Sequence, residues 1–159
     1  MSRTIYLLVF NQRPFKAHWC LWIPGEDNPN VGKRIHVEGS VSEGFRTTIT
    51  HNYDISRTSR RYQLIALGQV SSRHIVDPNA SLGQYDRAEN DTPTDKVESV
   101  ASAIPAPGPS LVSASSSQRH GRIQLNDCQT WLTQVISALV NEGILNDEAI
   151  NIIQSAPEH

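Results

Sequence analysis

The 159-residue chain has few cysteines, no long apolar run and no excess of charge of one sign. Its two cysteines are too few for the disulfide framework of a small secreted domain. No apolar stretch approaches the roughly 20 residues that cross a bilayer, and the N-terminal segment lacks the small-residue cleavage site of a signal peptide. Lys and Arg (14) nearly balance Asp and Glu (16), which argues against nucleic acid or anionic lipid as the main partner. We therefore expect a cytoplasmic protein of one domain, with reduced thiols and no transmembrane segment.

The first half of the chain has the pattern of a β-sheet. Five apolar segments rich in β-branched and aromatic residues alternate with turn residues, at 4–10, 17–23, 34–38, 45–50 and 61–70. Pro24 and Gly25 end the second segment, and the Asn/Pro/Gly-rich stretch that follows is typical of a loop. The spacing predicts an antiparallel meander of about five strands within residues 1–76.

The composition changes in the middle of the chain. Residues 77–122 show little periodic hydrophobicity and contain three closely spaced prolines followed by a run of serines at 115–117. This composition buries too little apolar surface to offset the entropy of ordering. We expect a flexible Pro/Ser-rich insertion, a disordered loop with one short ordered piece at 97–104.

Helical periodicity appears in the last part of the chain, 123–159. The residues that share one helix face are Cys128, Trp131, Leu132, Val135, Ile136, Leu139 and Val140. Asn126 is the expected N-cap, Gln129 completes a capping box, and Gly143 is placed to end the helix. A second short helix is expected at 147–154. The sequence predicts an α+β fold, with a small antiparallel sheet packed against a helix whose N-terminus carries Cys128.

Cys128 is the first candidate for a reactive side chain. As the second residue of a helix, its thiol would face unpaired N–H groups and the positive end of the helix dipole. Both lower the pKa of a thiol, and the same N–H groups can bind an oxyanion. Taken alone, Cys128 also fits a small buried residue that begins an apolar stripe, and that interpretation is the more common one.

Two histidines lie on predicted strands among apolar neighbours. His18 shares a strand face with Cys20 and Trp22, and a histidine facing a helix-borne cysteine is a base–nucleophile arrangement. His36 is positioned to fix the tautomer of His18 and to support its imidazolium. Each histidine alone also fits a core or half-exposed strand residue.

Three segments occur in a characteristic order: HWCLWI at 18–23, IHV at 35–37 and NDCQTW at 126–131. The combination resembles the circularly permuted papain-like thiol enzymes, which include the lecithin retinol acyltransferase family, the H-Ras-like suppressor phospholipase/acyltransferases and the PPPDE peptidases. It is also similar to a set of small uncharacterised fungal proteins. The resemblance implies a permuted papain-like fold in which Cys128 is the nucleophile, His18 the base and His36 the third polar group.

The activity implied by this resemblance is that of a thiol hydrolase, thiol protease or acyltransferase without cofactor or metal. Its substrate would be a small-molecule, lipid or peptide acyl compound, cleaved at an ester, thioester or amide, and no oligomeric state is indicated. The residues expected to line the substrate pocket are Cys20, Trp22, Trp131 and Asn126.

Three alternatives stay open at this point. The same pocket suits a biosynthetic cyclase or condensing enzyme, because the nucleophile and the base are shared. A non-catalytic binding module would use Cys128 for packing only. A zinc site is less well supported, because its spacing matches no compact zinc motif; its ligands would be His18, Cys20, His36 and Cys128.

Overall fold

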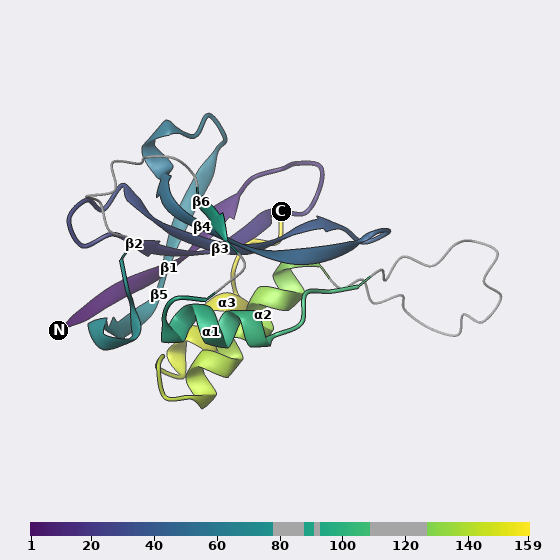
Figure 1. Cartoon of the computed structure of the whole chain (residues 1–159). Helices are drawn as coiled ribbons and strands as arrows, with labels where there is room; N and C mark the ends of the chain where they lie inside the picture. The colour runs from purple at the N-terminus through teal and green to yellow at the C-terminus, as the bar shows by residue number, and fades with distance from the viewer. Residues whose placement is uncertain (78–87, 91–92, 109–126) are drawn as a thin grey trace.

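The computed structural model describes residues 1–77, 88–90, 93–108 and 127–159 (Figure 1). It confirms the α+β class, with six strands, three α-helices and two short 3-10 turns. The strands are β1 (Ser2–Phe10), β2 (His18–Pro24), β3 (Val31–Ser40), β4 (Gly44–Asp54), β5 (Tyr62–Ser71) and β6 (Ala88–Asn90). The helices are α1 (Lys96–Ala103), α2 (Cys128–Asn141) and α3 (Glu148–Gln154), and the turns are η1 (Ile55–Arg57) and η2 (Ser72–His74). No helix in these ranges is long and apolar enough to cross a bilayer.

All strand pairs are antiparallel, in the order β5-β1-β2-β3-β4-β6. Strands β1 to β4 form the predicted meander, but β5 pairs with β1 and not with β4, so the prediction of a five-strand meander is wrong at its last connection. The physical reason lies in β1, whose second half is buried on both faces. Such a strand is stable in the interior of a sheet, where both of its edges are paired.

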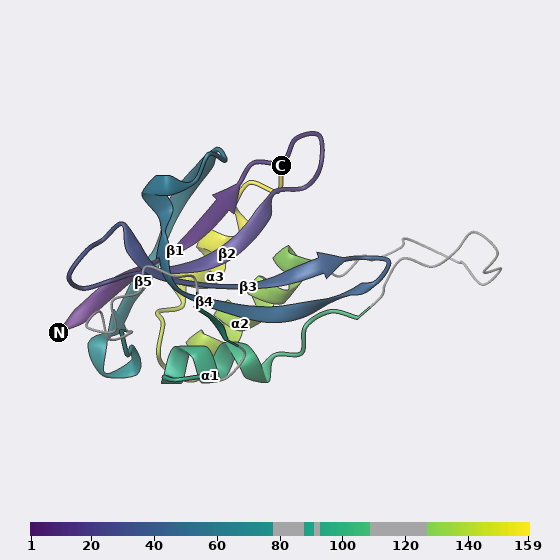
Figure 2. The same cartoon turned by 45° about the horizontal axis from the view of Figure 1, so that its top comes forward.

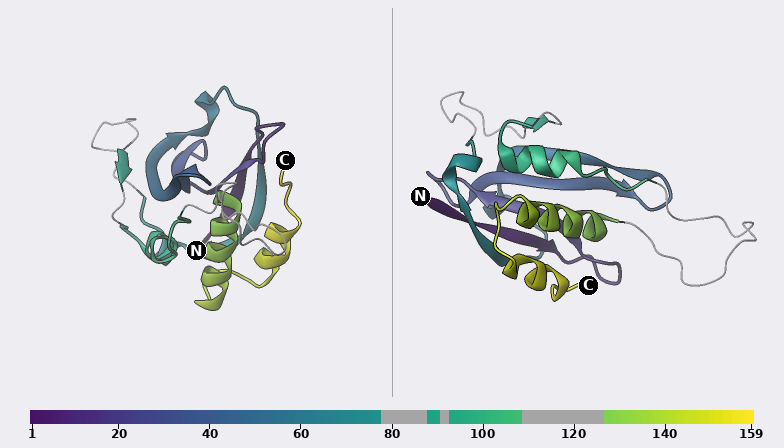
Figure 3. Two further views of the ribbon diagram at one scale, coloured as in Figure 1. Left: turned by 90° about the vertical axis from the view of Figure 1, so that its right-hand side faces the viewer. Right: turned by 90° about the horizontal axis from the view of Figure 1, so that it is seen from below.

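The three helices cover one face of the sheet (Figures 1 and 3). Strand β2 shows how the sequence divides the two faces: Trp19, Leu21 and Ile23 belong to the core shared with the helices, whereas Cys20 and Trp22 belong to a second apolar cluster on the other face. The apolar stripe of α2 packs into the shared core, as its periodicity predicts. The sheet therefore separates a helix side from an open side.

Helix α2 begins at Cys128, and its N-cap is Asp127. The Asp127 carboxylate accepts hydrogen bonds from the main-chain N–H groups of Gln129 (3.0 Å) and Thr130 (3.2 Å), and Thr130 completes the capping box. The predicted box of Asn126 with Gln129 is therefore wrong by one residue, and Asn126 itself lies outside the described residues. Gly143 follows the helix with φ of 74°, as expected for the residue that ends it.

The segment between β5 and α2 is not one flexible insertion. Residues 88–90 pair with β4, so the prediction of a flexible stretch is wrong for this piece. Helix α1 buries Val97 and Ala101 completely. The short ordered piece predicted at 97–104 corresponds to α1. Residues 78–87, 91–92 and 109–122 of the predicted insertion, including the serine run, lie outside the described residues.

Buried charges attach α1 to the sheet. The Lys33 ammonium donates to Glu98 at 2.7 Å and also to Asp95, and His51 Nε2 lies 3.1 Å from the other Glu98 oxygen. Burial alone would raise the pKa of Glu98, but hydrogen bonds from His51 and Lys33 lower it to about 2. The carboxylate is therefore ionised, and the helix is held to β3 and β4 by a paired charge network.

Candidate active site

His18 and His36 meet where the sheet opens. Strands β2 and β3 are paired only from Leu21 and Ile35 to Pro24 and Gly32, and beyond this ladder the two strands diverge (Figure 2). Across the opening, His18 Nε2 lies 3.0 Å from His36 Nδ1, with the two rings edge to face. The contact between the two histidines thus links β2 and β3 where the strands no longer pair, on the open side of the sheet.

Both imidazoles are neutral at neutral pH. Burial, with smaller contributions from the charges of Arg60 and Arg34, lowers the pKa of His18 to about 4. Burial, followed by the charge of Arg34, lowers the pKa of His36 to about 2. A neutral ring carries one N–H, so when His18 donates from Nε2, its Nδ1 keeps a lone pair and His36 carries its proton on Nε2. This is the tautomer in which His18 can act as a base.

Cys128 lies at the first turn of α2 against strand β2. Its Sγ donates to the Ala17 carbonyl at 4.0 Å. Burial raises the pKa of the thiol to about 11, although main-chain N–H groups, including that of Trp19, oppose this. The expectation that the helix N-terminus lowers this pKa is therefore wrong: desolvation outweighs the N–H groups, and the resting thiol keeps its proton.

Cys128 Sγ contacts the backbone on both sides of His18. The groups that face Sγ, the Ala17 carbonyl and the Trp19 N–H, belong to the residues on either side of His18. Within the described part of the chain, no hydrogen bond joins Sγ to the His18 ring. The His18 ring nitrogen that does not contact His36 is Nδ1. Cys128 belongs to the core on the helix side of the sheet, and His18 stacks on Phe10 of the open-side cluster.

Cys20 joins the two histidines on the open side. The ligand atoms of His18, Cys20 and His36 all lie within 4.8 Å of one another. Burial raises the pKa of the Cys20 thiol strongly, so it too is protonated. Cys128 is not a member of this group, and the four-ligand zinc arrangement considered from the sequence is therefore not assembled.

Of the residues expected to line a pocket, Trp22 lies on the same face as Cys20 and Trp131 does not. Trp22 packs edge to face against Tyr53 in the cluster of the open side. Trp131 is fully buried in the core under the helices, where its Nε1 donates to the Ile104 carbonyl at 3.0 Å. We therefore correct the expectation for Trp131: the residue packs the core.

Gln129 and Arg34 were not anticipated as site residues. Gln129 is buried, and its Nε2 donates to the carbonyls of Ala17 (2.9 Å) and Glu158 (3.0 Å), so it ties the start of α2 to strand β2. Arg34 is 8% exposed, and its guanidinium stacks over Tyr53 at 4.3 Å. Arg34 and His36 are two residues apart on β3, and this spacing is the sequence signal that places both side chains on one face.

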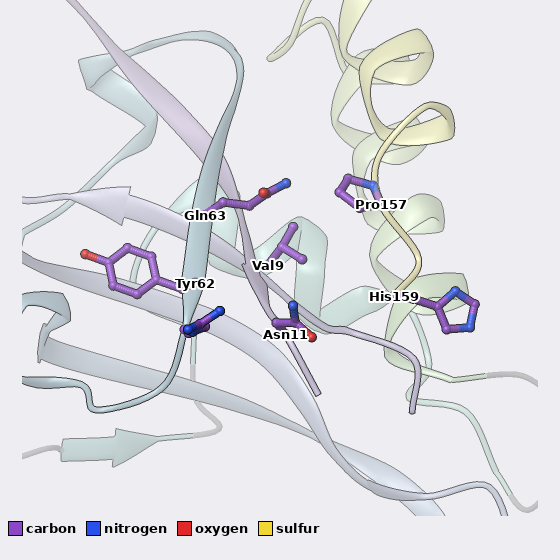
Figure 4. A pocket seen from close by; sticks show the side chains of 7 residues that line it. Val9, Asn11, Tyr62, Gln63, Pro157 and His159 are labelled. Carbon is purple, nitrogen blue, oxygen red and sulfur yellow. The ribbon is translucent and has the colours of Figure 1, made fainter. Parts of the chain in front are cut away.

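A separate cavity of about 210 Å³ lies between the C-terminal residues and the paired ends of β1 and β5 (Figure 4). Its lining residues are Val9, Asn11, Arg61, Tyr62, Gln63, Pro157 and His159. The C-terminal segment is held here by Trp19 Nε1, which donates to the Pro157 carbonyl at 3.0 Å, and by the Ala17 N–H, which donates to Glu158 at 2.8 Å. These bonds place the last residues next to the strand that Cys128 contacts.

Comparison with known proteins gives one match. A protein family described as a family of unknown function (DUF6540) matches residues 5–146, a range that runs from within β1 to beyond the end of α2 and includes Cys128. No curated protein and no solved structure matches the chain.

Proposed function

The chain belongs to the DUF6540 family, whose function is unknown, and from its own residues we propose that it is a cysteine-dependent hydrolase or acyltransferase. Cys128 is the nucleophile, His18 the general base and His36 the residue that orients the base. The observation that carries the proposal is the 3.0 Å contact between His18 Nε2 and His36 Nδ1, beside the strand backbone on which Cys128 packs. This contact leaves His18 Nδ1 available for a proton from sulfur.

The order of the elements supports a circularly permuted papain-like fold. Two histidine-bearing strands come first, and the cysteine-bearing helix follows much later in the chain. This helix packs on an antiparallel sheet and begins at Cys128 itself. The arrangement agrees with the thiol enzymes that the sequence resembles, and the role of each residue is carried over on that basis.

The reaction starts from a neutral pair, because the His18 pKa is about 4 and the Cys128 pKa is about 11. The thiol turns from the Ala17 carbonyl to His18 Nδ1. As sulfur attacks the carbonyl carbon of an ester, thioester or amide, its proton passes to His18, and the Cys128 main-chain N–H, which the Asp127 cap does not engage, holds the oxyanion. His18 then protonates the leaving group, and an acyl thioester on Cys128 remains.

Water or an acceptor alcohol or amine completes the turnover. The acceptor loses its proton to His18 while it attacks the thioester, and the thiol is regenerated. When the acceptor belongs to the substrate itself, the same steps give a cyclisation. The base contributes roughly 10²–10⁴-fold in rate, and an oxyanion donor roughly 10²–10³-fold.

Acylation by an activated ester, followed by peptide mapping, tests the proposal. We expect p-nitrophenyl esters to acylate Cys128, and His18→Ala to slow this by roughly 10²–10⁴-fold. His74→Ala is the matched control, because His74 is a partly exposed histidine in η2, outside the site. An adduct on another residue, or equal labelling of Cys128 without His18, would reject the mechanism.

A further inference from the structure

The open side of the sheet contains buried polar atoms that have no hydrogen-bond partner. They are Arg34 Nε, His36 Nε2 and Thr50 Oγ1, and their residues are 8%, 1% and 0% exposed. Buried polar atoms in folded proteins are almost always paired. Among the described residues, three unpaired atoms on one sheet face therefore indicate that a further group completes this site.

The three residues form one patch, which we call the β3–β4 polar patch. Arg34 and Thr50 are directly opposite each other in the β3–β4 ladder, so their side chains share a face. His36 follows two residues after Arg34 on the same face, at a strand distance of about 7 Å. The three residues therefore border one region of the open face.

The charge of this region is positive. Arg34 makes no ion pair in the described part of the chain, and it stacks on Tyr53 instead. Arg60 adds a second guanidinium at 4.1 Å from the Phe10 ring centroid, and Phe10 in turn stacks on His18. The acid that approaches the histidines is Glu38, which is 43% exposed and 3.6 Å from His36 Nε2. Such a field attracts an anion and opposes a cation.

The hydrogen-bonding character of the patch agrees with its charge. With His18 in its base-competent tautomer, His36 Nε2 is an N–H donor, as are Arg34 Nε and the Thr50 hydroxyl. The patch then offers three donors, and the Thr50 hydroxyl is also able to accept. A carboxylate, which only accepts hydrogen bonds and matches the planar guanidinium, suits these donors.

We propose that the β3–β4 polar patch binds a carboxylate of the substrate, so that the acyl compound carries an anionic group in addition to the carbonyl that Cys128 attacks. The catalytic part of this inference rests on the proposed function. The binding part rests on the patch alone, and the two are tested separately.

Binding is tested by NMR, following the arginine Nε–H signals during titration with glutarate and, as the uncharged analogue, glutaramide. We expect glutarate to shift one signal in a saturable way, and that signal to be missing from Arg34→Gln. Arg34→Gln and Thr50→Val should weaken glutarate binding, the former roughly 10- to 100-fold. Arg57→Gln is the control, because Arg57 is exposed and paired with Asp54, and it should leave binding unchanged. Equal responses to glutarate and glutaramide, or unchanged binding in Arg34→Gln, would overturn the inference.

Turnover separates this inference from the proposed function. We expect the p-nitrophenyl monoester of glutaric acid to have a kcat/KM roughly tenfold or more above that of p-nitrophenyl butyrate, with the preference lost in Arg34→Gln. Equal turnover of both esters through Cys128 would support the proposed enzyme and overturn the carboxylate site. Glutarate binding without turnover of either ester would keep the carboxylate site and remove the enzyme.

A cobalt titration tests whether this side of the sheet binds a cation instead of an anion. His18, Cys20 and His36 are close enough together to bind a transition metal. We expect Co²⁺ to produce no thiolate absorption band, because Arg34 and Arg60 oppose a cation here. A Co²⁺ band that disappears in Cys20→Ser, with no response to glutarate, would assign the site to a metal and overturn the inference.

Discussion

His36 Nδ1 accepts from or donates to His18 Nε2 at 3.0 Å, and this contact bridges β2 and β3 beyond the end of their ladder. The bond occupies the far nitrogen of His18 and orients the ring. Because both rings are neutral, the direction of this single bond decides whether His18 Nδ1 holds a lone pair or a proton. In the proposed mechanism His36 is a positioning residue, so its role can be tested separately from packing.

Replacement of His36 tests this role. His36→Leu removes the partner of His18 Nε2 and should reduce kcat for ester hydrolysis roughly 10²-fold or more with a smaller change in KM. His36→Gln keeps a carbonyl oxygen able to accept from Nε2 and should recover part of the loss. Steady-state kinetics on the folded variants measure both. If the leucine and glutamine variants lose the same activity, His36 acts by packing alone.

The pH dependence of acylation reports the base. His18 must be neutral to accept the thiol proton, and burial lowers its pKa to about 4. The rate of Cys128 acylation should rise as pH increases through about 4 and then stay level, because the thiol remains protonated up to about 11. Labelling at constant ester concentration across this range gives the profile. A rise centred between pH 8 and 9 would instead indicate an exposed thiolate acting without His18.

The sequence predicted which side chains of β2 share a face more securely than it predicted the pairing of the strands. Alternation along β2 placed His18, Cys20 and Trp22 on one face, because side chains of a strand alternate whatever their partners are. The position of β5 beside β1 was not predictable in this way, since strand spacing carries no record of which edges pair. Burial of Cys128 was the more common interpretation of the sequence, but the direction of its pKa shift was wrong, because a local helix-dipole argument does not include the strand that covers the thiol.

Helix α1 illustrates the limit of apolar patterns. It was recognised as a short ordered piece, but the charges that hold it come from β3 and β4, more than 40 residues earlier in the chain. Lys33 interrupts an otherwise regular strand, and only the folded chain shows that it reaches Glu98. Buried polar contacts over such sequence distances leave no periodic signal.

Stability should fall in acid because of the two site histidines. Their pKa values are lowered in the folded state, so below pH 6.5 the unfolded chain binds protons that the folded chain does not. The free energy of unfolding therefore does not depend on these two histidines above about pH 6.5. As pH falls from there toward 4, it decreases by about 1.4 kcal/mol per pH unit for each histidine. Urea unfolding between pH 4.5 and 8 measures the slope. We expect His36→Leu to reduce it, and His74→Leu to leave it nearly unchanged.

The buried charge network should be sensitive to loss of its cation. Lys33→Met leaves Asp95 and Glu98 buried without the ammonium that pairs with both, and we expect a loss of about 3–5 kcal/mol in the free energy of unfolding. Lys96→Met is the matched control, because Lys96 is half exposed and 3.8 Å from Glu142, and it should cost less than about 1 kcal/mol. Similar losses for the two variants in urea unfolding would show that the network is no stronger than a surface pair.

Arg34 should behave in the opposite way if its guanidinium is kept for a ligand. It is buried without an ion pair in the described part of the chain, so Arg34→Met removes a desolvated charge and loses a cation–π contact worth about 0.5–2 kcal/mol. We expect the ligand-free variant to be as stable as the natural protein or more so. Arg3→Met is the comparison, because Arg3 is similarly buried but pairs with Asp77 at 2.7 Å, and its loss should cost about 1–3 kcal/mol. Urea unfolding of both variants without added anion gives the difference. If Arg34→Met loses as much free energy of unfolding as Arg3→Met, the Arg34 guanidinium stabilises the fold without a ligand. The inference of a carboxylate site is then overturned.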